Sequence, residues 1–134
     1  MKCTFAVCAE GASVDSTSNL LSIFNIIDEI NSQTFPVAFP RLVVVFIVER
    51  ADGDEDRNEA FITFKVNNEE KVRQPVLMDF QDKKRLRLVL QFAGIVFTEP
   101  GQVRASLVLG QEELGSWKLD IILTGGLEPK VAIS

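Results

Sequence analysis

Residues 19–30 read NLLSIFNIIDEI, and the conformation of this stretch decides whether the chain is all-β or mixed. Its apolar residues fit the spacing of one helix face, and Ser18 or Asn19 can cap such a helix. The composition points the other way, because the stretch holds four isoleucines and one phenylalanine. β-Branched and aromatic side chains prefer a pleated sheet. We therefore predict a strand over residues 20–30.

The second half of the chain alternates between apolar and polar residues, as half-buried strands do. Three such strands are predicted, at residues 85–92, 103–109 and 117–123. Gly94 interrupts the apolar pattern that continues from the first of them, which predicts a β-bulge or a sharp bend. Glycine-containing turns at 98–102 and 110–116 join the strands, so we predict an antiparallel meander.

The first half of the chain also consists of predicted strands. Residues 41–50, RLVVVFIVER, contain seven consecutive apolar side chains. Such a run predicts a strand that is covered on both faces, either by the rest of this chain or by another chain. Further strands are predicted in the N-terminal stretch MKCTFAVCAEGASV, at residues 1–14, and at residues 60–66 and 74–81. The tail from residue 124 is predicted to be frayed or to form a short last segment.

The composition is typical of a single globular domain, which we expect to span residues 1–134. Hydrophobic residues make up 46% of the chain and charged residues 25%. The net charge of −5 disfavours a nucleic acid as partner, because binding to phosphates depends on an excess of Lys and Arg. No apolar run approaches the roughly 18 residues of a membrane span, and the N-terminal run is too short for a secretion signal. We therefore expect a cytoplasmic protein.

Cys3 and Cys8 are the two cysteines of the chain. They are five positions apart on one predicted strand, so we expect them to face opposite sides of the sheet and not to form a disulfide. Two cysteines without a histidine cannot build a usual structural zinc site. Both are predicted to be small side chains in or beside the core.

The run CAEGASVDSTSNLLSIFNIIDEI at residues 8–30, followed by Phe39, Pro40 and a long strand, resembles the start of a family of small bacterial all-β proteins of unknown function. Residues 96–121, VFTEPGQVRASLVLGQEELGSWKLDI, resemble the second half of the same family. The resemblance implies an all-β sandwich and favours the strand at residues 20–30. Its motifs are strand-and-turn patterns, so it implies no functional residue.

Residue types that many catalytic mechanisms require are missing from the sequence. The absence of histidine excludes Ser-His-Asp and Cys-His arrangements within the chain. No glycine-rich phosphate loop or nucleophile-elbow motif is present either. We therefore expect a protein that is not an enzyme and that needs no cofactor.

An acidic loop contains the candidate metal ligands of the sequence. Asp52, Asp54 and Asp56 begin like a calcium-binding loop, whose oxygen ligands suit a hard cation. The pattern then departs from an EF-hand, because Arg57 stands where that loop needs glycine and Thr63 stands where it needs glutamate. The favoured interpretation is a solvated hairpin tip whose charges prevent edge association, and no bound metal.

Three other features each have a structural and a functional interpretation. The basic residues Lys83, Lys84, Arg85 and Arg87 form either a solvated turn or a contact for an anion or acidic partner. Phe35 and Phe39 either cover one end of the core or form an exposed lip for a partner. Trp117 is in phase with the core-facing side of its predicted strand.

Together these patterns predict an all-β, two-layer antiparallel β-sandwich, Ig-like or C2-like, with about seven or eight strands. The expected function is a non-catalytic protein-interaction or structural module, accessory to a larger bacterial protein or assembly. Such a module has a protein partner or associates with itself. The alternative is a Ca²⁺-dependent or lipid-surface binding module of the C2-like type, in which Asp52, Asp54 and Asp56 bind the cation.

Overall fold

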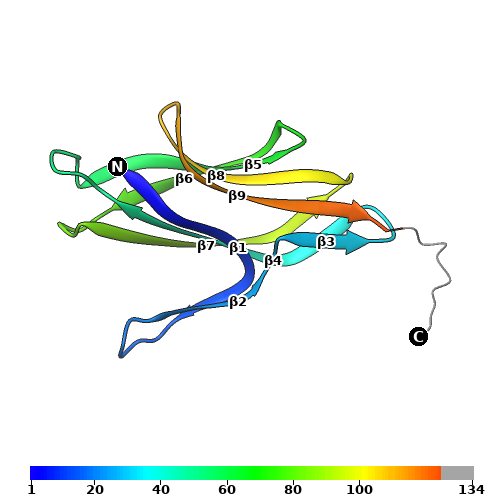
Figure 1. The fold of residues 1–134 in the computed structure, drawn as a ribbon, viewed down its shortest axis with the longest axis horizontal. Coiled ribbons are helices and arrows are strands. Elements are labelled where there is room, and N and C mark those ends of the chain that lie inside the picture. The colour runs from blue at the N-terminus through cyan, green and yellow to red at the C-terminus, as the bar shows by residue number, and fades with distance from the viewer. Residues whose placement is uncertain (125–134) are drawn as a thin grey trace.

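The computed structural model describes residues 1–124, and these residues form nine strands in two stacked sheets (Figure 1). The four-stranded sheet has the order β2-β1-β4-β7. Its strands are β1 (Lys2–Val14), β2 (Leu21–Ile26), β4 (Val37–Glu49) and β7 (Arg85–Phe97). The five-stranded sheet has the order β3-β9-β8-β5-β6. Its strands are β3 (Glu29–Ser32), β5 (Arg57–Val66), β6 (Glu69–Asp79), β8 (Gly101–Leu109) and β9 (Glu112–Leu123). The predicted all-β sandwich is confirmed, whereas most of the predicted tail lies outside the described residues.

The strand count exceeds the prediction because residues 20–30 form two strands instead of one. β2 pairs with β1 in the first sheet, and β3 pairs with β9 in the second. The chain crosses between the sheets at Ile27, just after Asn25 adopts a left-handed backbone with φ of 57°. The β3–β9 pair is parallel, so the predicted antiparallel sandwich was wrong at this ladder. The predicted meander was also wrong, because β7 lies in the first sheet whereas β8 and β9 pair in the second.

Two connections are shorter than the gaps between the predicted strands, namely residues 67–73 and 110–116, because charged residues extend the neighbouring strands beyond the core. Asn67 and Asn68 alone connect β5 to β6, and both have positive φ, as type I′ hairpin turns require. The predicted turn at 110–116 shrinks to Gly110 and Gln111, and β9 begins at Glu112. Apolar alternation does not detect such strand ends, because their side chains face solvent on both sides.

Gly94 produces a bend in β7 rather than a bulge. The pairing of β7 with β4 passes through this point without a register shift, so the predicted bulge is absent. Gly94 has a φ of 69°. Before it an even-numbered residue, Leu88, is buried, and after it an odd-numbered residue, Phe97, is buried, so the strand exchanges its inner and outer faces at Gly94. Pro40 lies across from the bend, in a part of β4 where β7 is the one bonded neighbour, so its missing N–H is tolerated.

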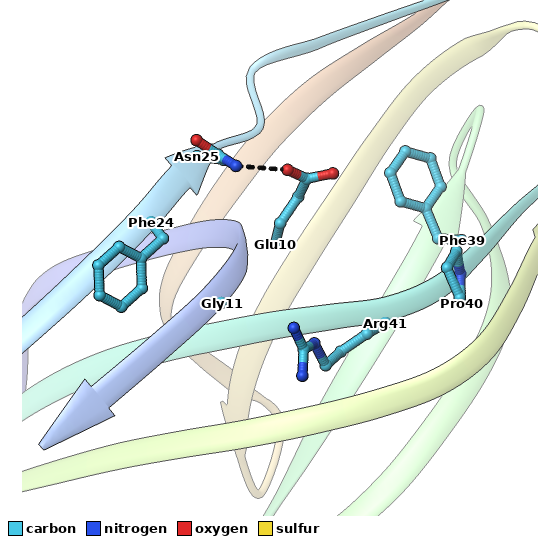
Figure 2. Close-up of a pocket in the computed structure, with 7 residues that line it drawn as sticks. All are labelled: Glu10, Gly11, Phe24, Asn25, Phe39, Pro40 and Arg41. Atoms are coloured by element: carbon cyan, nitrogen blue, oxygen red, sulfur yellow. Dashed lines mark hydrogen bonds between the residues drawn. The ribbon is translucent and has the colours of Figure 1, made fainter.

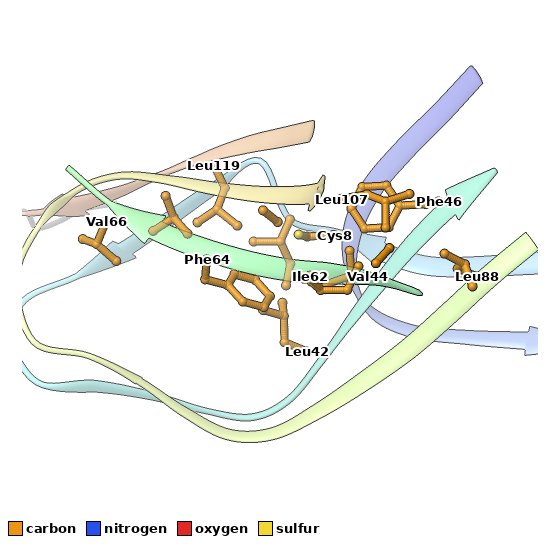
Figure 3. Packing of buried hydrophobic residues seen from close by; sticks show 14 of the residues in the cluster. Cys8, Leu42, Val44, Phe46, Ile62, Phe64, Val66, Leu88, Leu107 and Leu119 are labelled. Carbon is orange, nitrogen blue, oxygen red and sulfur yellow. The ribbon is translucent and has the colours of Figure 1, made fainter. Parts of the chain in front are cut away.

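The main core lies between the two sheets and holds side chains from both (Figure 3). On β4, Leu42, Val44 and Phe46 point into it and are buried. The facing sheet supplies Phe64, whose ring meets that of Phe92 edge to face at 5.1 Å between centroids. The even-numbered apolar residues of β4 therefore have the environment that the sequence predicted.

The opposite face of β4 is covered by the chain itself. β1 turns back after its first half, and the hairpin that it forms with β2 leaves the line of the sheet (Figure 1). Val43 and Val45 are buried in a second cluster together with Val7. Side chains of the hairpin pack against this cluster, namely Ala12, Leu21 and Ile23. The seven-residue apolar run is thus covered on both faces within one chain, and its outer face needs no partner.

The two cysteines lie on the same side of β1, contrary to the prediction. A register irregularity between Cys3 and Phe5 shifts the alternation by one residue, so that Cys3 packs beside the main core and Cys8 within it. Both thiols are unpaired. Burial raises the pKa of the Cys8 thiol to about 12. Cys3 also closely approaches Gly115 of β9, where a Cβ atom would collide with its sulfur.

The aromatic residues singled out in the sequence contact the core. Phe35 and Phe39 are partly buried against it, and the Phe39 ring meets Phe97 edge to face at 6.1 Å between centroids. Trp117 is also partly buried, and its indole Nε1 donates a 2.8 Å hydrogen bond to the carbonyl oxygen of Ile27. This bond ties β9 to the point at which the chain crosses between the sheets.

Candidate functional site

The free edges of the two sheets differ sharply in how well they are protected from pairing with another strand. Among residues 1–124 the edge strands are β2, β7, β3 and β6. β3 has four residues, and β2 has six with a left-handed residue near its end. β6 contains Pro75 and four charged residues in its first five positions. Short length, proline and charge are the devices that block edge pairing, so three of the four edges are protected.

β7 lacks these devices along most of its length. It has 13 residues and, within the part of the chain that the structure describes, pairs with β4 alone. Its charged residues, Arg85 and Arg87, lie at one end, and residues 88–97 carry no charge. Val89 is 39% exposed, and Phe92 is partly buried at this side of the core. The edge of β7 is therefore the candidate interaction site.

The three aspartates predicted as metal ligands are not gathered around a common point. Asp54 accepts a 2.8 Å hydrogen bond from the backbone N–H of Ala51 and forms a 3.0 Å ion pair with the N-terminal amino group of Met1. The Ala51 N–H and then that amino group lower the pKa of Asp54. No group of three His, Cys, Asp or Glu side chains in residues 1–124 is arranged to hold a metal ion.

The remaining carboxylates of this loop also face cations of the protein. Asp56 pairs with Arg50 at 3.2 Å and accepts a 2.7 Å hydrogen bond from the N–H of Asp82. The hollow beside Asp52 is also lined by Asp54 and Asp82, and the cationic side chains of Arg50 and Lys84 lie in the same lining. The loop is thus held by internal contacts that occupy Asp54 and Asp56.

The basic residues near the start of β7 serve partly as structural contacts. Arg85 donates from Nε and Nη2 to one carboxylate oxygen of Glu49, at 3.2 and 2.7 Å. Arg87 donates from Nη1 to the carbonyl oxygen of Asn19 at 3.2 Å, which fixes the tip of the β1–β2 hairpin over the sheet. These two side chains therefore join neighbouring parts of the chain.

A polar cluster on the outer face of the second sheet was not singled out by the sequence analysis. The Glu113 carboxylate bonds the Arg104 guanidinium and the Ser106 hydroxyl. The Arg104 bond is the main cause that lowers the pKa of Glu113 to about 2. Thr63 lies nearby, and its buried hydroxyl has no hydrogen-bond partner. The sequence feature that could have revealed this cluster is the alternation in residues 103–109, where Arg104 and Ser106 lie on the face opposite the apolar residues.

The fold and its surfaces define the chain as a two-sheet, all-β sandwich domain, with one long unprotected edge among the described residues. The chain belongs to a family of unknown function, DUF6941, whose model matches residues 4–122. The expected membership of an uncharacterised family is thereby confirmed. The described residues contain no helix long and apolar enough to cross a membrane.

Comparison with curated proteins finds no match. Among solved structures, the chain is similar to a β-glucosidase from Listeria innocua in complex with glucose, at 10% sequence identity and a TM-score of 0.40. The similarity covers 71% of this chain and 15% of the glucosidase chain. This likeness is too weak to bear on function.

Proposed function

We propose that this protein is a non-catalytic interaction module whose β7 edge pairs with β7 of a second copy, as an accessory component of a cytoplasmic bacterial assembly. The observation that carries the proposal is the long edge of β7, which contains no proline and carries no charge from residue 88 onward. The unpaired thiols of Cys3 and Cys8 support a reducing compartment. The calcium alternative gains no support, since Asp54 and Asp56 already face cationic partners.

The part of β7 before Gly94 determines the register in which two copies pair. Gly94 has a positive φ, so we place the segment that pairs between copies before it, at residues 85–93. A two-fold axis at Val89 pairs this whole segment with itself in the antiparallel direction. Arg85 of one copy then lies opposite Ala93 of the other, and Arg87 lies opposite Gln91. No two like charges face each other, and Val89, which is 39% exposed, meets its own counterpart.

This register makes opposite predictions for two substitutions at one exposed position. Gln91→Glu places a carboxylate opposite Arg87 of the other copy, once on each side of the axis, and strengthens the dimer. Gln91→Arg places a second guanidinium there and weakens it. Each directly opposed charge pair contributes roughly 0.2–1 kcal/mol, attractive in one variant and repulsive in the other. With two pairs in each dimer, the two dissociation constants are expected to differ by about fourfold to several hundredfold.

Sedimentation velocity over a range of concentrations measures these constants for the full chain. Wild type is expected to approach twice 14.9 kDa at high concentration. The double variant Arg87→Glu with Gln91→Arg restores opposite charges and is expected to restore the dimer. Lys118→Glu, at an exposed residue on β9, is the control and leaves association unchanged. A strict monomer, or dissociation constants that are the same for both Gln91 variants, would refute the proposal.

A further inference from the structure

A second candidate site lies where β1 and β4 separate. The last pair between these strands joins Ala9 to Val43, and β1 then turns away with β2 while β4 remains paired with β7. The gap encloses a pocket of about 370 Å³, here called the fork pocket (Figure 2). It is lined by Glu10, Gly11, Phe24, Asn25, Phe39, Pro40 and Arg41.

The walls of the fork pocket carry two aromatic rings. Phe24 extends from β2 beside Gly11, its partner on β1, and is 52% exposed. Phe39 extends from β4 on the other side of the pocket (Figure 2). An apolar ring that is half exposed at the mouth of a pocket offers surface that a ligand can remove from water.

The two charged side chains of the fork pocket differ in whether they already have a bonding partner within the protein. Glu10 lies between the two rings and accepts a 2.7 Å hydrogen bond from the side-chain amide of Asn25 (Figure 2). Arg41 is exposed and takes part in none of the ion pairs formed within residues 1–124. The pocket therefore holds one carboxylate, which is bonded to a neutral amide, and one guanidinium without an ion-pair partner among these residues. The Arg41 guanidinium suits an acidic group on the ligand, and the Glu10 carboxylate favours an approach from the Arg41 side of the pocket.

The backbone around the gap also has unused hydrogen-bonding capacity. Residues 11–14 of β1 pair with β2 alone, and residues 37–42 of β4 pair with β7 alone. On the sides that face the gap, neither segment has a partner strand among the described residues. An extended peptide is the class of ligand that can both pair with such a backbone and present side chains to a pocket.

We propose that the fork pocket binds an extended peptide segment that carries an acidic side chain close to an aromatic one. The acidic group pairs with the Arg41 guanidinium, and the aromatic side chain packs between Phe24 and Phe39. This inference does not depend on the β7 dimer, because none of the residues lining the pocket belongs to β7.

The probe for this proposal is a displayed library of random ten-residue peptides, selected on the immobilised full chain. Selected peptides are expected to combine Asp or Glu with an aromatic residue. A selected peptide is then synthesised, and its affinity is measured by fluorescence anisotropy. Arg41→Glu is expected to weaken binding at least tenfold, and Phe24→Ala several-fold. The control Lys118→Glu makes the same change of charge at an exposed residue of β9, a strand that does not line the fork pocket, and this variant is expected to bind the peptide like wild type.

A charge exchange separates direct contact from a general effect of charge. The same peptide with Lys in place of its acidic residue is expected to bind Arg41→Glu better than it binds wild type. Thermal melts of each variant verify that the fold is intact, which is expected because Arg41 and Phe24 are exposed. Failure to select any peptide overturns the proposal. Equal affinity for wild type and Arg41→Glu, or an equal loss in Lys118→Glu, also overturns it.

Discussion

Two valines that face each other across β4 and β7 test whether the β1–β2 hairpin covers the outer face of the sheet. Val45 pairs with Val89, and both lie on that face. Val45 is 0% exposed because it belongs to the cluster beneath the hairpin, whereas Val89 is 39% exposed. Replacing each by alanine removes the same atoms from a covered site on the central strand β4 and from an exposed site on the edge strand β7. The measurement is made at protein concentrations below the dissociation constant of any dimer.

The expected costs follow from burial. Val45→Ala removes two methylene-sized groups from a closed site, worth about 1.6 kcal/mol by transfer at 0.8 kcal/mol each. The cavity left under the hairpin adds roughly another 1 kcal/mol. Val89→Ala leaves no closed cavity and loses a transfer term reduced by its exposure, so we expect less than about 1 kcal/mol. Val45→Ala is thus expected to destabilise the fold by about 1.5 kcal/mol more than Val89→Ala.

Urea unfolding of the wild type and both variants measures these free energies, provided that the slope with denaturant stays constant. Leu21→Ala, which removes cover from the hairpin side, is expected to lower the cost of Val45→Ala in the double variant, because both residues belong to one cluster. Equal costs for the two valine variants, together with additivity of Leu21 and Val45, would show that the hairpin does not cover the sheet.

Three further outcomes follow from the contacts described above. Glu113→Gln is expected to cost about 1 kcal/mol at pH 7, discounted because the side chain is 36% exposed. In the folded protein the pKa of Glu113 is lowered from 4.5 to about 2, so this stabilisation is complete above about pH 4.5 and is lost as the pH falls toward 2. Acid titrations that compare the unfolding of the wild type and of Glu113→Gln measure this loss. In a Cys3→Ser variant, Cys8 is expected to resist a thiol reagent at pH 8 until urea unfolds the chain, and rapid labelling of this native variant would contradict the burial of Cys8. Millimolar Ca²⁺ is expected to leave the melting temperature unchanged, because Asp54 and Asp56 are occupied by internal contacts, and a clear rise would restore the calcium hypothesis.

The strands could be predicted from the sequence where one face of the strand is buried in the core and the other face is exposed to solvent. Leu119 and Ile121 of β9 are buried and alternate with the exposed Lys118 and Asp120, so the periodicity directly reports the fold. The same logic failed for β2, where Phe24 and Ile26 are more than half exposed. Apolar composition shows that a segment forms a strand, but not which face meets the core or whether a partner covers it.

The arrangement of the strands depended on local irregularities that alternation does not encode. The displacement of register near Cys3 and the bend at Gly94 each exchange the inner and outer faces of a strand. The fork pocket was missed because it arises where two pairings diverge and contains no motif. Two signals were available, namely Glu10 at the end of an apolar run and Pro40 inside a strand.

The parallel pairing of β3 with β9 has a consequence for biosynthesis. β3 has β9 as its hydrogen-bonded neighbour, and Glu29 lies opposite Asp120, so residues 29–32 cannot pair until residues 120–123 have left the ribosome. Until then Ile30 has no neighbouring strand to pair with, and its side chain, which is buried in the folded protein, stays exposed to water on the nascent chain. Closure of the second sheet is therefore a late event, and formation of such distant contacts is slow.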